Sequence, residues 1–265
     1  MPALVPRYDL TLLDYWQLKR DGEPVDVGAR QQRVITVLAL LGVRPRHFIA
    51  TLLWPDGSEE RAAGNLRASI FRISHQLPLL ICGSEPLKLH DHVRVDVRQL
   101  REKIGIVIDS RDSGVPVATI EHLRTSDLLC TSELLPGWYE DWVVAEQELL
   151  QHERVDALEI LARRYLAQGN TERALVAARA ASTIEPLRES VQLLLVRGHL
   201  ASDNRATAIA TYRNFCVTLR RELGVPPSPR FAELLQPGRA VTSPGMRNEN
   251  HRRVDTTTSL RASSR

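Results

Sequence analysis

A stretch of eleven residues recurs 34 positions later in the C-terminal half of the chain. Tyr165–Leu175 aligns with His199–Ile209, and Leu, Ala, Asn and Ala are identical between the two copies. This period is the length of a helix-turn-helix unit that stacks on its neighbours. One such unit cannot bury its apolar face alone, so two in tandem imply further helices and a groove that holds a ligand. The pattern therefore predicts a helical protein built to bind rather than to catalyse.

The side chains of the first copy also follow the pattern of tetratricopeptide repeats. These repeats require small residues, large residues and a proline at set positions. In the first copy, the residues at these positions are Leu158, Ala162, Tyr165, Ala174, Ala178, Ala181 and Pro186. The second copy keeps an alanine at Ala208 and has Tyr212 four residues later. We expect Ala174 and Ala208 to lie where paired helices approach closely, because a larger side chain would not fit there.

The length and charge of the chain set limits on its organisation. With 265 residues and 43% hydrophobic content, the sequence suffices for two folded units. The net charge is +2 over residues 1–100, −3 over 101–236 and +4 over 237–265. The middle of the chain therefore lacks the excess positive charge of a nucleic-acid-binding surface. Residues 237–265 have few large apolar side chains, so we expect a disordered basic tail or simply a solvated terminus.

Cysteines and hydrophobic runs indicate the compartment. Cys82, Cys130 and Cys216 are far apart and form no C-x-x-C pair, which indicates neither a disulfide framework nor a zinc ribbon. No signal-peptide pattern and no apolar run of membrane-spanning length are present. We expect a cytoplasmic protein that does not contact a membrane.

The N-terminal part alternates between strand and helix patterns. Residues 9–27 alternate in polarity about Asp21 and Gly22, which predicts short strands joined by a hairpin. Three helices are predicted, over 30–41, over the short apolar stretch 47–54 and over about 58–77. A second hairpin is predicted from Leu79–Cys82 and Leu87–Val97. Three helices that end in a hairpin make a winged helix-turn-helix, whose third helix enters the major groove of DNA.

The helix predicted over residues 58–77 has two chemically different faces. Its apolar side consists of Ala62, Leu66, Ile70, Ile73 and Leu77. On the other side, arginines suit guanine edges or phosphates, Asn65 suits an adenine edge and Phe71 suits a thymine methyl. Gly64, with Ala68, leaves the backbone uncovered for close approach. The predicted DNA-binding residues are Arg61, Asn65, Arg67, Ala68, Phe71, Arg72 and His75. The alternative is an ordinary amphipathic helix with a solvated polar face.

Two further segments have distinctive composition. Leu134–Trp142 holds two tryptophans and a tyrosine at a helix start, which predicts a hydrophobic clamp between elements. Ile104–Asp109 is a β-branched run with poor helix propensity, which leaves the secondary structure of residues 101–128 open.

No sequence feature favours an enzyme. The phosphate-binding, dinucleotide-binding, zinc-protease and serine-hydrolase motifs are all missing. His90 and His92 alternate on one strand, but a metal ion would need further ligands, so a surface histidine pair is expected. We expect no catalytic residue, no cofactor and no bound metal.

Several motifs together resemble the Streptomyces antibiotic regulatory protein family. Leu53–Asp56, Glu60–Ala62, Asn65–Arg67 and Phe71–Arg72 are similar to its DNA-binding segment. Leu134–Trp142, the repeats and Glu222–Pro229 are similar to its bacterial transcriptional activator domain. The similarity covers roughly residues 8–236. Members commonly place a second basic residue just after the Phe-Arg pair, where this chain has Ser74 and His75.

The resemblance implies a transcription activator with an OmpR-type winged helix. It implies binding to direct repeats in double-stranded promoter DNA and contact with RNA polymerase holoenzyme, with a homodimer as a further possibility. The expected parts are a winged helix-turn-helix over 1–95, an all-α tetratricopeptide-like activator domain over 96–236 and the tail over 237–265. We expect a two-domain member without the ATPase module and sensor repeats of larger relatives. The alternative is a repeat-based interaction scaffold whose winged helix no longer binds DNA.

Overall fold

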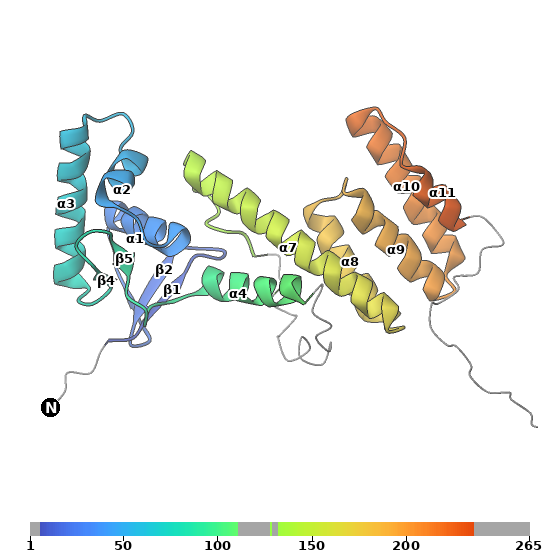
Figure 1. Ribbon diagram of the computed structural model, residues 1–265, viewed down its shortest axis with the longest axis horizontal. Helices are drawn as coiled ribbons and strands as arrows, with labels where there is room; N and C mark the ends of the chain where they lie inside the picture. The colour runs from blue at the N-terminus through green and yellow to red at the C-terminus, as the bar shows by residue number, and fades with distance from the viewer. Residues whose placement is uncertain (1–5, 111–127, 129–131, 236–265) are drawn as a thin grey trace, which may run out of the picture.

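A small sheet and three helices form one end of an elongated molecule, and helical repeats form the other (Figure 1). This computed structural model describes residues 6–110, 128 and 132–235. The strands are β1 Tyr8–Thr11, β2 Gln17–Arg20, β3 Glu23–Val25, β4 Ile81–Cys82, β5 Lys88–Leu89 and β6 Arg94–Val95. The first helices are α1 Ala29–Leu41, α2 Arg46–Leu53 and α3 Glu59–Gln76. The predicted fold class, mainly α with a small β component, is confirmed.

The main sheet has the strand order β3-β2-β1-β6. The predicted hairpin about Asp21 and Gly22 joins β2 to β3, and both turn residues have positive φ angles, 54° and 93°. The second predicted hairpin is shorter than expected, because only β4 and β5 form it. β6 instead pairs in parallel with β1, where Leu10 lies opposite Val95. Both side chains are buried, so burial in the main sheet decides where this strand goes.

Helix α3 begins and ends close to the predicted bounds. The Ser58 hydroxyl accepts a hydrogen bond from the Arg61 amide at 3.4 Å, and two glutamates occupy the first turn. Both features favour a helix start, because they satisfy free amides and complement the helix dipole. The predicted apolar side faces the core, with Ala62, Leu66 and Ile73 buried and Leu77 just beyond the helix buried as well.

The β-branched run at Ile104–Asp109 is helical, against its local propensity. It forms the second half of α4 Asp96–Asp109, which lies against the long helix α7 Asp141–Ala167. Val97, Leu100, Ile104 and Val107 recur at helical spacing and are buried. The apolar area that α4 buries outweighs a propensity cost of at most about 0.7 kcal/mol per residue. Residues 111–127 lie outside the described residues.

Polar contacts fix α4 to the winged helix. The Asp96 carboxylate accepts the amides of Leu12, Leu13 and Val97 at 2.7–3.0 Å, and burial raises its pKa against the effect of these bonds. Arg98 donates to the carbonyls of Leu38 and Ala39 in α1 at 2.7 and 2.8 Å. One apolar core also runs continuously from the sheet into the repeats. The predicted division at residues 95/96 stays a prediction, since the two parts share this core.

The repeats follow the 34-residue period of the sequence. After α7 come α8 Thr171–Ile184, α9 Glu189–Ala201, α10 Arg205–Leu223 and α11 Pro229–Leu235. Asn170 and Asn204, identical in the two copies, each cap a helix by accepting the amide three residues later, at 3.2 and 3.3 Å. Ala174 and Ala208 are 1% and 0% exposed, as the close-approach positions require.

Replacing Ala208 with leucine should lower the stability of the protein. The position is fully buried beside Val196 and Phe215, and overpacking a filled core costs about 1–3 kcal/mol. Thermal unfolding followed by circular dichroism should show a melting temperature lower by about 2–10 °C. Ala210→Leu is the matched control, because Ala210 lies on the same helix and is exposed. An unchanged melting temperature in Ala208→Leu would contradict the proposed packing of the repeats.

The aromatic clamp at Leu134–Trp142 is only partly as predicted. Trp138 and Trp142 pack against the core, but the Tyr139 side chain is 84% exposed and takes no part. Leu134 forms a bridge to Leu13, which extends the contact between the winged helix and the activator part. In the described part of the chain, no helix is long and apolar enough to cross a membrane. The predicted tail, 237–265, lies outside the described residues.

Candidate nucleic-acid interface

The exposed face of α3 carries most of the predicted DNA-binding residues in one line. Because a helix advances about 100° per residue, Ala68 and Arg72 each project within about 20° of Arg61. All three are exposed, and so is His75 at the end of the same line. Asn65 is half-buried and lies between Arg61 and Ala68 along it. The structure therefore brings the predicted residues together on a surface about four turns long.

The arginines on α3 are available to a ligand. Within the described residues, the side chains of Arg61, Arg67 and Arg72 form no ion pair or hydrogen bond. Arg67 is exposed and lies beside Gly64, since its Nη2 would be 3.9 Å from a Cβ added there. Apart from the neighbouring residues and the backbone of α3 itself, no other atom lies within 4 Å of that added Cβ. The backbone at Gly64 is thus bare, as close approach to DNA requires.

Phe71 is the large apolar side chain of this surface. Its side chain is 63% exposed, and its ring centroid lies 4.1 Å from that of His75. The His75 Nδ1 also lies 3.0 Å from the Phe71 carbonyl oxygen. An aromatic group held open to solvent next to arginines suits contact with a thymine methyl or a sugar. Because the Phe71 side chain is largely exposed, it contributes little to the core.

Residues distant in sequence hold the C-terminal end of α3. The Arg20 Nη1 donates to the Gln76 carbonyl at 3.3 Å, and the Tyr8 hydroxyl donates to the Pro78 carbonyl at 3.1 Å. Burial raises the pKa of Tyr8 above the ordinary tyrosine value, which itself lies well above neutral pH, and the protonated hydroxyl can donate this bond. Sequence reasoning missed both positioning residues, because no local pattern links a strand residue to a helix end far along the chain.

The wing formed by β4 and β5 is anchored but has no free cation at its tip. Arg44 and Leu87 exchange backbone hydrogen bonds, and Arg46 Nε donates to the Ser84 carbonyl at 2.6 Å. Gly83 has a φ of 84°, and a Cβ there would meet the Pro86 carbonyl oxygen at 2.5 Å. The exposed tip carries Glu85.

Charged and titratable groups near the wing add little positive charge. Lys88 is paired with Asp91 at 3.0 Å. His90 and His92 are half-buried, so the expected surface histidine pair is wrong. Their rings lie 4.1 Å apart, and burial, helped by the charge of His90, lowers the pKa of His92. No group of three or more metal-ligating side chains occurs in the part of the chain that the structure describes. Lys88 therefore adds little net positive charge to the α3 surface.

Similarity to known proteins extends over most of the chain. Residues 95–237 match the family profile described as the bacterial transcriptional activator domain. The chain is 26% identical over 224 residues to the regulatory protein AfsR of Streptomyces coelicolor, which covers 82% of this chain and 23% of AfsR.

A solved structure shows the same fold. The chain superposes with a TM-score of 0.64 and 20% identity on Mycobacterium tuberculosis EmbR, solved in complex with a low-affinity phosphopeptide. The match covers 87% of this chain and 64% of that one. The chain thus spans about a quarter of the length of AfsR and about two thirds of the EmbR chain.

Proposed function

Because this chain belongs to the bacterial transcriptional activator domain family, we propose that it is a sequence-specific DNA-binding transcription activator. Helix α3 enters the major groove of promoter DNA, where Arg61, Asn65 and Arg72 contact base edges or phosphates. The observation that carries this proposal is the row of unpaired, exposed arginines on α3 beside an exposed Phe71. AfsR is by name a regulatory protein, which agrees with a role in gene control.

The helical repeats have a different role in this proposal. They bind protein partners. The first is RNA polymerase holoenzyme, and the second, in a homodimer, is another copy of the chain. α3 lies at one end of the long axis and α10 and α11 at the other (Figure 1), so DNA and a partner can be bound together. No enzymatic step is part of the function.

A second function, a protein-interaction scaffold, is favoured by one observation. The wing tip carries Glu85 and no free cation, which is a poor contact for a phosphate backbone. In this alternative the winged helix docks on another protein, and the arginines of α3 pair with carboxylates instead of phosphates.

A selection from randomised duplex DNA separates the two functions. The full chain is expected to enrich a defined sequence, arranged as a direct repeat if two copies bind side by side. A gel-shift salt titration on the enriched duplex should give a log–log slope of about −3 per bound chain, because α3 supplies three free arginines. Failure to enrich any sequence at low salt would favour the scaffold. Activation is then tested with a reporter gene behind the enriched sequence.

A further inference from the structure

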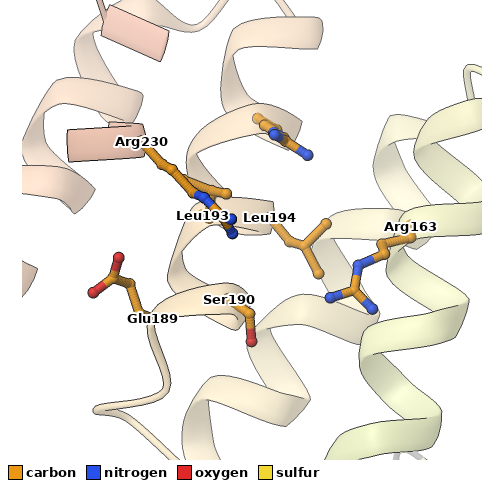
Figure 2. Close-up of a pocket in the computed structure, with 7 residues that line it drawn as sticks. Arg163, Glu189, Ser190, Leu193, Leu194 and Arg230 are labelled. Atoms are coloured by element: carbon orange, nitrogen blue, oxygen red, sulfur yellow. The ribbon is translucent and has the colours of Figure 1, made fainter. Parts of the chain in front are cut away.

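A pocket of about 460 Å³ opens in the helical repeats between α7, α9 and α11. Figure 2 shows Arg163 on one side and Arg230 on the other, with Ser190 and Leu194 between them. Glu189, Leu193 and Arg197 of α9 complete the lining. Three arginines from three separate helices therefore line one pocket, and its floor is partly apolar.

The positive charges in this pocket are incompletely balanced. Arg197 and Arg230 form no side-chain ion pair or hydrogen bond with any residue that the structure describes. Arg163 pairs with Glu159, but that carboxylate also accepts the Arg188 Nη2 at 2.9 Å. Bringing like charges together is unfavourable unless an anion joins them. The arrangement is that of a site for a negatively charged ligand.

The carboxylate at the edge of the pocket has another function. Glu189 accepts the Ser228 backbone amide through both oxygens, at 3.1 and 3.2 Å. This contact ties the segment before α11 to the start of α9. A hydrogen bond to a backbone amide does not cancel the charge of a carboxylate, so Glu189 both ties Ser228 to α9 and offsets part of the positive charge of the three arginines.

The segment that begins at Glu222 folds back to deliver Arg230. α10 ends at Leu223 and is capped by Gly224, which has a left-handed φ of 71°, and prolines follow. Phe231, next to Arg230, is fully buried against the rings of Tyr212 and Phe215, with centroids 5.5 and 5.4 Å away. The family-like segment Glu222–Pro229 thus has a structural role, because it places a cation from the chain's last described helix over α9.

We propose that this pocket binds an acidic segment of a partner protein. Arg197 and Arg230 grip carboxylates of the segment, since guanidinium groups pair with carboxylates through two parallel hydrogen bonds. Leu193 and Leu194 receive an apolar side chain next to them. The inference rests on the partner contact proposed above for the repeats and names its chemistry. A peptide fits better than DNA, because the three arginines, although exposed, lie around a pocket between helices that has a leucine floor, and not along one helix face.

The test uses the full chain and a short fluorescein-labelled peptide of alternating aspartate and leucine. Fluorescence anisotropy is expected to show saturable binding, and the same peptide with asparagine for aspartate should bind at least about tenfold more weakly. The double variant Arg197→Gln, Arg230→Gln should also lose about tenfold or more. Arg213→Gln, an exposed arginine on α10 outside the pocket, should bind as the parent does.

Three results would overturn the proposal: no saturable binding, equal binding of the asparagine peptide, or equal binding by the double variant. Circular dichroism checks that the double variant is folded. Its binding to the selected DNA should equal that of the parent, because α3 lies at the other end of the molecule. Peptide binding without any DNA selectivity would support the proposed pocket and contradict the activator function. DNA selectivity without peptide binding would support the activator function and contradict the proposed pocket.

Discussion

Replacing Arg61 and Arg72 together with alanine is expected to weaken binding to the selected DNA by at least about 30-fold. Each lost contact to a base edge or phosphate costs about 1–3 kcal/mol, and residues eleven positions apart on a helix act on separate parts of the site. The two side chains are exposed and unpaired within the described residues, so helix content and melting temperature should remain close to those of the parent. Gel shift at fixed salt measures the effect.

The control for this double variant removes the same charge elsewhere. Arg213→Ala with Arg220→Ala changes two exposed arginines on α10, at the far end of the molecule from α3. If this control lost as much affinity as the α3 variant, binding would depend on net charge and not on the face assigned to DNA. Unchanged affinity in the α3 variant would likewise refute the assignment.

Phe231→Ala should cost about 3–5 kcal/mol in the free energy that holds α11 on α10. The ring is fully buried between Tyr212 and Phe215, and removing a buried aromatic side chain leaves a cavity as well as losing its burial. Since Phe231 anchors Arg230, affinity for the aspartate–leucine peptide should fall as well. Hydrogen exchange of the α10 and α11 amides measures the local loss of stability, and urea unfolding measures the global loss. Fluorescence anisotropy measures the loss of peptide affinity.

The same substitution at Phe71 provides the matched control. Phe71 is 63% exposed, so Phe71→Ala should change stability by no more than about 0.5 kcal/mol. Equal stability of the Phe231→Ala variant and the parent would mean that α11 is not fixed by this contact. The pocket would then lack its third arginine in solution.

The structure also corrects the expected wing. The alternation in Val93–Val95 correctly predicted a strand, but the strand's partner is β1 and not the wing. Strand propensity does not specify a partner, because pairing depends on which face is buried in the complete fold. The consequence for function is that the wing is short and its tip bears Glu85, which is a poor contact for a phosphate backbone.

Local patterns in the sequence determined the helices, their caps and the face of α3. The 34-residue period predicted close helix contacts at Ala174 and Ala208, which are buried, and it aligned Asn170 with Asn204, which the structure places as helix caps. Each of these roles depends on neighbours within a few residues. The tertiary structure alone decided the helical state of Ile104–Asp109, the parallel pairing of β6 with β1, and the placement of Arg197 and Arg230 in the lining of one pocket. These features depend on contacts between segments far apart in the chain, where burial and charge act only after the helices have packed.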